Sequence, residues 1–220
     1  MNYRILFLMA FLSLNAFAQN VIEYRGEKIN ALDEQGKPDG IWKLFDEENQ
    51  LMIITEFKKG VLITPTKYYK NSRLIAIYKY EDGFEIYKDD KVFKARFQRS
   101  PDGSRRLIDI TGNDLDEAVA KYFYDAGQIM PMFYGGKNEL YSFIGNNVNY
   151  SKIKKNTGKV IIGFVIDAIG KVSEIEVIES SNPELNEEAK RVISIMPRWQ
   201  PGHQAGAFVK CKYTIPVNIN

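Results

Sequence analysis

The pattern of hydrophobic and polar positions is most informative in the segment 130–220 of this 220-residue chain. Apolar residues at helical spacing predict a helix that opens at Gly135-Gly136 and runs to about Val148. The stripe that this helix would bury consists of Leu140, Phe143, Ile144 and Val148. The patterns that follow predict strand, strand, helix and strand, which together make an α+β layer with a small antiparallel sheet.

Two strands follow the first predicted helix. The strand at 159–166 is apolar on both faces, which indicates that both faces are covered. A turn at 167–170 leads into a second strand at 171–179, whose alternation slips by one position after Val172. Because such a slip moves every later side chain to the opposite face, we expect a β-bulge near Ser173-Glu174.

The second helix of the segment has clear start and stop signals. Asn182 is a candidate N-cap, and Pro183 suits the first helical position, where no backbone N–H is missed. Pro197 ends the pattern. The predicted buried stripe consists of Leu185, Ala189, Val192, Ile193 and Met196.

The last predicted strand covers 209–219. By the two-residue period, Val209, Cys211, Tyr213, Ile215 and Val217 share one face, and Lys210, Lys212 and Thr214 take the other. A strand that enters after a crossover helix and lies at the rim of its sheet has unpaired N–H and C=O groups, to which a partner segment can add. The predicted partner-binding residues are Val209, Lys210, Cys211, Lys212, Tyr213, Thr214 and Ile215.

The preceding region, 19–110, is rich in predicted strands and contains a weak internal repeat. The stretch from Phe45 to Gly60 aligns with the stretch from Tyr68 to Gly83 at a constant offset of 23 residues. A period of this size is typical of repeats built from one hairpin each. An ordinary β-meander with an aromatic core explains the same pattern.

The sequence between the repeat and the segment 130–220 predicts two further features. Strands at 92–97 and 106–110 flank Pro101-Asp102-Gly103, which favours a tight turn. A short helix at 115–124 then forms a connector within 111–129.

The first residues predict export. Arg4, an apolar run at 5–14 and the small-x-small sequence Ala16-Phe17-Ala18 are typical of a signal peptide, 1–18, cleaved after Ala18. The run is much shorter than the roughly 20 apolar residues of a spanning helix, although an uncleaved anchor is the alternative. We expect a soluble periplasmic protein that contacts a membrane only through a partner.

Composition and residue types favour binding over catalysis. A net charge of +2 argues against a nucleic-acid partner, which requires a concentrated basic face. Cys211 is the single cysteine and is expected to be a buried apolar thiol, while the single histidine, His203, is expected in an exposed turn. Glu174 and Glu176 share a face that we expect to be solvated. We therefore predict no catalytic residues, no metal site, no cofactor and no enzymatic activity.

Two resemblances extend this interpretation. The segment 130–219 contains a series of motifs, which are Met130-Pro-x-Phe-x-Gly-Gly136, Asp167-x-x-Gly170, Pro183-Glu-Leu-x-x-Glu-Ala189, Met196-Pro-x-Trp-x-Pro-Gly202 and Tyr213-x-Ile-Pro-Val217. In this order and spacing, the segment resembles the C-terminal domain of the energy-transducing TonB family. The stretch 36–83, with Asp39-Gly40-Ile41-Trp42, resembles the MORN-repeat variant of antitoxin-like proteins.

The TonB resemblance implies a domain that binds protein segments by strand addition in transport across the outer membrane. The implied partner is an outer-membrane TonB-dependent receptor or another envelope protein, and a homodimer is possible. The alternative is an exported structural or adhesion module that uses the hairpin repeats, with the TonB-like domain for dimerisation.

Overall fold

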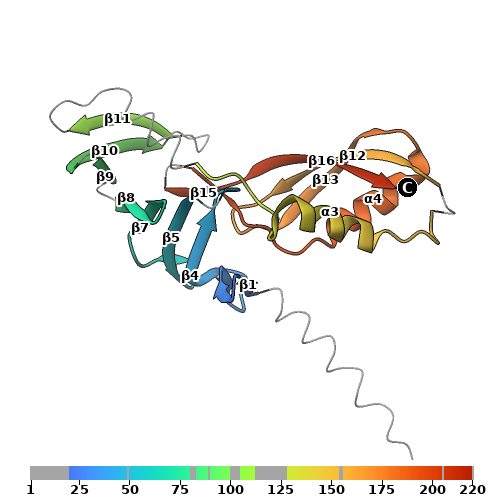
Figure 1. The fold of residues 1–220 in the computed structure, drawn as a ribbon, viewed down its shortest axis with the longest axis horizontal. Helices are drawn as coiled ribbons and strands as arrows, with labels where there is room; N and C mark the ends of the chain where they lie inside the picture. Colours follow the sequence, from blue (N-terminus) through green and yellow to red (C-terminus); the bar gives the residue numbers. More distant parts are fainter. Residues whose placement is uncertain are drawn as a thin grey trace, which may run out of the picture. The chain divides into compact units, whose positions relative to one another are not determined.

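The computed structural model has an α+β fold made mostly of antiparallel strands with few helices (Figure 1). It describes residues 20–48, 50–79, 83–88, 90–99, 105–111, 128–153, 156–204 and 206–219. Contacts divide the chain into two compact units, Met1–Ala126 and Gly127–Asn220. The predicted signal peptide, the turn at Pro101-Asp102-Gly103 and the connector helix lie outside the described residues. No helix in the described part is long and apolar enough to cross a membrane.

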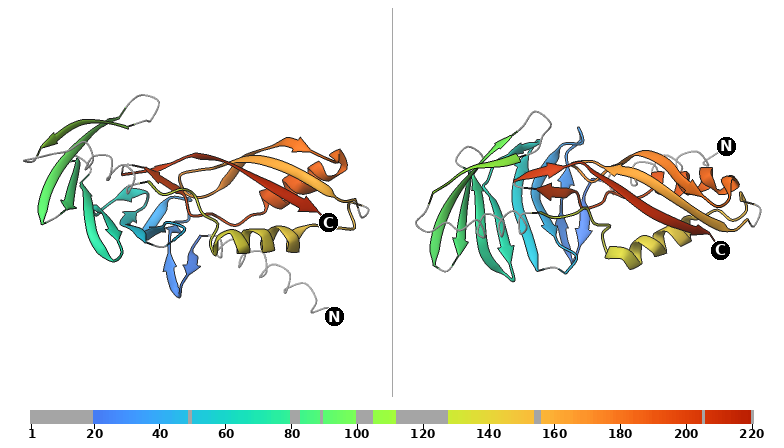
Figure 2. Two further views of the ribbon diagram at one scale, coloured as in Figure 1. Left: turned by 45° about the horizontal axis from the view of Figure 1, so that its top comes forward. Right: turned by 90° about the horizontal axis from the view of Figure 1, so that it is seen from above.

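The N-terminal unit consists of a small hairpin and a nine-stranded antiparallel sheet (Figure 2). The hairpin pairs β1 (Ile22–Tyr24) with β2 (Glu27–Ile29). The sheet contains β3 (Ala31–Leu32), β4 (Pro38–Phe45), β5 (Leu51–Lys58), β6 (Val61–Leu62), β7 (Thr66–Lys70), β8 (Arg73–Lys79), β9 (Gly83–Lys88), β10 (Lys91–Arg99) and β11 (Arg105–Thr111). Strands follow in the order β11-β10-β9-β8-β7-β5-β4-β3, and β6 pairs with β5.

The 23-residue repeat is visible in the second strand of each hairpin. Ile53 in β5 and Ala76 in β8 are both fully buried, and the next inward positions, Thr55 and Tyr78, are also buried. These pairs occupy equivalent places in two successive hairpins, so the offset found in the sequence corresponds to a structural period there.

The repeat fails in the first strand of each hairpin. Phe45 at the end of β4 is half-buried, whereas its counterpart Tyr68 in β7 is fully buried. The hairpin β7–β8 turns through Asn71-Ser72, both with positive φ, and the register shifts between Tyr68 and Tyr69. This tight turn replaces the longer loop between β4 and β5, and the inward positions of the first strand change by one residue.

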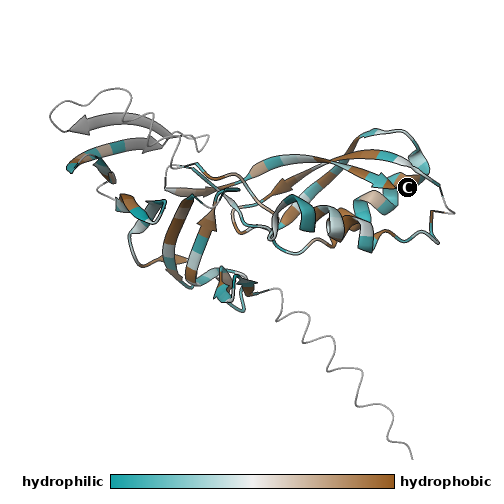
Figure 3. Cartoon of the chain, viewed as in Figure 1, coloured by the Kyte–Doolittle hydropathy of each residue, from teal (hydrophilic) through white to brown (hydrophobic). Residues whose placement is uncertain are grey.

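The C-terminal unit is a three-stranded sheet with two helices on one face. Its elements are α3 (Gly136–Asn147), β12 (Gly158–Ile166), β13 (Val172–Ser180), the 3₁₀ helix η1 (Pro183–Leu185), α4 (Asn186–Ser194), β14 (Gly202–Gln204), β15 (Ala207–Val209) and β16 (Cys211–Ile219). The sheet order is β13-β12-β16, with antiparallel neighbours throughout. Teal and brown stretches alternate along α3 and α4, as expected of helices with one buried face (Figure 3).

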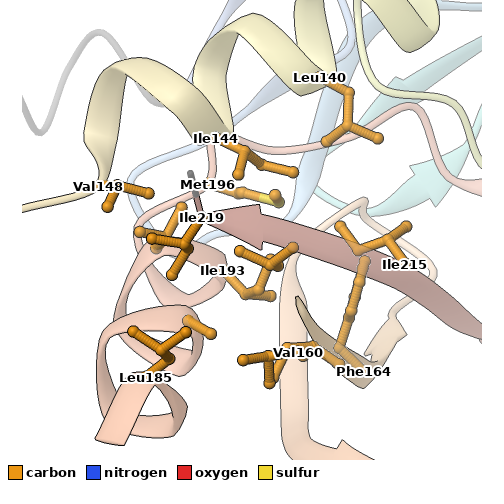
Figure 4. Packing of buried hydrophobic residues seen from close by; sticks show 14 of the residues in the cluster. Leu140, Ile144, Val148, Val160, Phe164, Leu185, Ile193, Met196, Ile215 and Ile219 are labelled. Carbon is orange, nitrogen blue, oxygen red and sulfur yellow. The ribbon is translucent and has the colours of Figure 1, made fainter. Parts of the chain in front are cut away.

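One hydrophobic core joins both helices to β12 and β16. Side chains of α3 and α4 point toward those of the two strands (Figure 4). Its members include Leu140, Ile144, Val160, Ile162, Phe164, Ile166, Leu185, Ala189, Val192, Ile193, Met196, Ile215, Val217 and Ile219. Both predicted helix stripes are therefore confirmed, as are the inner-face positions Tyr213, Ile215 and Val217 of the last strand.

The prediction that both faces of the strand 159–166 are covered is confirmed for Val165, which is buried, but only in part for Ile161. Ile161 lies on the face of β12 opposite to the core and is half-buried. Val165 on the same face is buried but lies outside the core cluster. Both helices of the unit pack on the other face, so apolar residues on two faces of a strand do not require two helical layers.

The β-bulge predicted near Ser173-Glu174 is confirmed. Val165 and Gly163 of β12 are two residues apart, whereas their partners Ser173 and Glu176 in β13 are three apart. Glu174 adopts a φ of 51°, which a bulge permits in this bent stretch. The extra residue brings Ile175 and Val177 back onto the core face, where both pack against the cluster.

A second bulge in β13 was not predicted. Ile161 and Ile162 are adjacent in β12, but their partners Glu179 and Val177 are separated by Ile178. Ile178 is 55% exposed. Because residues 177 and 178 are both apolar, the alternation of polar and apolar positions does not reveal this shift of register.

The second helix begins as its capping residues predict. The side-chain Oδ1 of Asn182 accepts a hydrogen bond from the Glu184 N–H at 3.2 Å, and Pro183 takes the first position. The first turn is the 3₁₀ helix η1, which continues into α4.

The turn between β12 and β13 is held against the loop that carries Trp199. Oδ1 of Asp167 accepts the N–H groups of Ile169 and Lys171 at 2.9 and 2.8 Å. The Trp199 N–H donates to the Gly170 carbonyl at 2.8 Å. Gly170 has a φ of 87°, and a Cβ there would lie 1.9 Å from the Trp199 carbonyl oxygen. Only glycine permits this approach.

The Gly170→Ala variant is therefore expected to lose about 3 kcal/mol or more of unfolding free energy, because both backbone strain and a clash with backbone oppose the added methyl. The matched control is Gly145→Ala within α3, where a Cβ meets nothing within 4 Å. That change should stabilise by about 0.5–1 kcal/mol. Urea unfolding followed by circular dichroism measures both, and equal midpoints for the two variants would contradict the account.

A buried carboxylate joins the two helices. Glu188 of α4, with its side chain 4% exposed, accepts Arg191 Nε at 2.9 Å, Arg191 Nη2 at 2.7 Å and the Asn149 N–H at 2.6 Å. Arg191 Nη2 also donates to the carbonyl of Asn147, the last residue of α3. The Arg191 hydrogen bonds, aided by the Asn149 N–H, outweigh burial and hold the pKa of Glu188 below its usual range.

Because the pKa of Glu188 is lowered on folding, its ionised form stabilises the folded chain above the unfolded pKa of about 4.3, and this stabilisation is lost as pH falls through the folded value. Glu188→Gln should cost roughly 1–3 kcal/mol at pH 7, and less as pH falls below about 4. Glu187→Gln, on the exposed side of the same helix, is the control. Denaturant titrations across pH test this, and a pH-independent cost would contradict it.

Candidate partner-binding site

The last strand lies at the rim of its sheet. β16 pairs with β12 over its whole length, from Cys211 opposite Ile166 to Ile219 opposite Gly158, with no shift of register. In the described sheet, β12 is its only neighbour. One side of β16 therefore has backbone groups that no strand of this sheet uses.

The position of Pro216 indicates which residues of β16 direct their backbone groups outward. Pro216 is opposite Ile161 and has no N–H, so this must be a pair that exchanges no hydrogen bonds. Backbone direction alternates along a strand, so Lys212 and Thr214 also direct their N–H and C=O groups away from β12. A proline in this position is typical of an edge strand.

Side chains alternate between the two faces of this edge. Lys212 and Thr214 are exposed on the face away from the core, while Cys211 and Tyr213 are half-buried on the core face. Ile215 is buried. An added strand would meet one lysine and one threonine side chain on one face and a partly apolar rim on the other.

Five of the seven predicted partner-binding residues lie on β16, and two do not. Val209 belongs to β15, where it pairs with Gly202 of β14. Lys210 stands between β15 and β16. The alternation of side chains continues from Val209 into β16, so no sequence pattern indicates that the strand breaks at Lys210. The role of Cys211, Lys212, Tyr213, Thr214 and Ile215 in binding stays a prediction.

The predicted exposed turn around His203 is wrong. His203 is 1% exposed and lies in β14. It exchanges backbone hydrogen bonds with Ile129 at 2.8 and 2.9 Å, and its ring packs edge-on against Phe208 at 5.3 Å. The pairing joins segments more than seventy positions apart in the chain, which flanking glycines in the sequence do not reveal.

An aromatic cluster anchors the edge strand from its core face. Trp199 is 1% exposed, and its ring centroid lies 5.1 Å from Tyr213, 5.4 Å from Phe133 and 5.7 Å from Phe164. Such edge-on aromatic contacts add to the free energy of area burial. Tyr213 is thus held in place from behind, while part of it reaches the rim.

Cys211 has the surroundings of a structural thiol. It is half-buried, and burial raises its pKa. Its Sγ packs against Gly202, where an added Cβ would lie 2.6 Å from the sulfur. A raised pKa reduces the fraction of reactive thiolate.

Other chemistry has little support in the described residues. Glu174 and Glu176 are exposed, which confirms the predicted solvated face. In the described part of the chain, no three residues of His, Cys, Asp and Glu gather closely enough to hold a metal ion.

Cys211 in the folded chain is expected to react with a thiol-specific reagent at pH 8 at least tenfold more slowly than in 8 M urea, since both burial and the raised pKa oppose attack. Absorbance of the released thiol dye gives both rates. Equal rates would show that this face is open enough for a disulfide between two chains.

Residues 149–220 match the sequence model of the family described as Gram-negative bacterial TonB protein C-terminal. Searches of curated proteins and of solved structures found no match. The matched segment contains β12, β13, α4 and β16, whereas α3 precedes it although Leu140 and Ile144 pack into the same core. No match covers the N-terminal unit, so its resemblance to MORN repeats stays a prediction. The C-terminal unit therefore contains a segment similar to the TonB C-terminal family.

Proposed function

We propose that this chain is a TonB-like envelope protein that binds an extended segment of a partner protein by strand addition at the outer edge of β16. It acts as a binding protein, not as an enzyme. Its partner is an outer-membrane TonB-dependent receptor or another envelope protein, and its setting is transport across the outer membrane from the periplasmic side.

The observation that carries the proposal is the regular, one-sided pairing of β16. Lys212 and Thr214 direct backbone donors and acceptors outward from a strand fixed by the core and by the aromatic cluster around Trp199. Strand addition uses such groups for affinity and alternate side chains for selectivity. The family match over residues 149–220 supports the same interpretation, because it includes the whole of β16.

The N-terminal unit supports a second candidate function. Its nine-stranded sheet has its own buried face, which includes Trp42, Leu44, Ile53, Tyr68 and Phe84. The buried positions of β5 recur in β8, the second strand of the next hairpin. An exported structural or adhesion module would use this unit for contact and the C-terminal unit for dimerisation. In that case, changes in the N-terminal unit would abolish partner capture, and changes in β16 would not.

Thr214→Pro is expected to abolish partner capture while leaving the fold intact. The substitution removes an outward N–H that β12 does not use, and edge strands accept proline, as Pro216 already demonstrates. The measurement is capture of outer-membrane proteins from a solubilised envelope fraction by the immobilised full-length chain, quantified by mass spectrometry. We expect at least a tenfold loss.

Thr214→Ala is the matched control, because it removes the same side chain and keeps the N–H. It should capture as the unmodified chain does, and both variants should retain the unmodified circular dichroism spectrum. Equal capture by the proline and alanine variants would overturn strand addition at β16.

A further inference from the structure

We infer that the β16 edge selects a short segment in which acidic residues alternate with apolar residues. The inference rests on the proposed strand addition and concerns which segment is accepted. It follows from the regularity of the two sheet edges, from the backbone N–H and C=O groups available on β16, and from the side chains on the two faces of that strand.

Only one edge of the sheet is regular. β13, at the opposite edge, has two bulges, with Glu174 at a φ of 51° and Ile178 as an extra residue. Bulges interrupt a ladder and protect an edge from added strands. β16 has no register shift along its length. An extended partner therefore finds a continuous ladder at β16 alone in this sheet.

The ladder that β16 offers is short. Lys212 and Thr214 each provide an outward N–H and C=O, but the next outward position, Pro216, provides no N–H. In the other direction the strand ends at Cys211, since Lys210 lies outside it. A segment of about five to seven residues is enough to use these groups.

On its exposed face, β16 carries one lysine, Lys212, and no acidic side chain. Lys212 is exposed, and its neighbour across the ladder in β12 is Val165, which carries no charge. Lys210 is also exposed and adjoins the end of the strand. In the described part of the chain neither lysine forms an ion pair, whereas Lys43, Lys79 and Lys190 each have an acidic partner.

A residue directly opposite Lys212 on an added strand would place its Cβ about 4.5–5.5 Å away, on the same face. Opposite charges at that distance stabilise the pair, and like charges destabilise it. The residues of the segment on this face are therefore acidic.

The other face of the ladder is apolar at its rim. Tyr213 and Cys211 are half-buried there, and Tyr213 rests on Trp199 with ring centroids 5.1 Å apart. Residues of the added segment that alternate with the acidic ones would cover these two side chains. Burial of that remaining surface favours apolar residues.

The same lysine disfavours a second copy of the chain as the occupant. If Lys212 pairs with Thr214 of an antiparallel copy, the two Lys212 side chains are diagonal neighbours across the ladder. Like charges at that separation oppose the pairing. An acidic segment has the opposite sign and is attracted.

The test uses the full-length chain and two synthetic seven-residue peptides with blocked ends, one in which Val alternates with Glu and one in which Val alternates with Lys. Fluorescence anisotropy of the labelled peptides at low salt gives the affinities, and NMR of the ¹⁵N-labelled chain locates the site. We expect the Glu peptide to bind about fivefold or more tightly than the Lys peptide, with shifts at the amides of Lys212 and Thr214. The preference should shrink at high salt.

Lys212→Glu should erase or reverse this preference. The matched control is Lys159→Glu, an equal charge change on the same sheet, where Lys159 is exposed and lies opposite Asn218 at the far end of β16. That variant should keep the preference within about twofold.

Equal binding of both peptides with shifts at Lys212 and Thr214 would overturn the acidic selectivity and leave strand addition standing. Binding of neither peptide, or binding away from β16, would also overturn the inference. The Thr214→Pro capture experiment decides strand addition independently of these results.

Discussion

The register of β16 against β12 is the constraint on which the C-terminal unit depends. Ile215, Val217 and Ile219 are buried in the core that α3 and α4 form with β12. A slip of one residue would move all three to the exposed face and bring Lys212 and Thr214 into the core. The same alternation fixes backbone direction, so burial on one face determines which N–H and C=O groups of β16 point away from β12 in the described sheet. Folding and the proposed binding thus depend on the same register.

Several contacts reinforce that register from a distance. Gly170 lets the β12–β13 turn approach the Trp199 loop, and Trp199 in turn packs behind Tyr213 on the edge strand. Glu188 and Arg191 attach the end of α3 to α4. The core also needs Leu140 and Ile144, which precede the segment that matches the TonB C-terminal family. The structural unit is therefore larger than the family match.

Local signals in the sequence were enough for much of this fold. The helix stripes, the Asn182 cap and the bulge at Glu174 each depend on residues close in the chain, and all three were predicted correctly. The burial of His203 depends on its pairing with Ile129, and the break at Lys210 depends on the β14–β15 hairpin. Neither of these contacts follows from a periodic pattern in the sequence. Outward groups on β16 could be assigned only once the pairing of Pro216 with Ile161 was known.

Amide hydrogen exchange along β16 tests the central claim most directly. In the free chain at neutral pH, the amides of Lys212 and Thr214 should exchange rapidly, while those of Ile215 and Val217, which pair with β12, should be protected. Addition of the peptide in which Val alternates with Glu should slow exchange at Lys212 and Thr214 and leave Ile215 and Val217 unchanged. Protection of Lys212 and Thr214 in the free chain, or binding of the peptide without added protection at these two amides, would contradict the account.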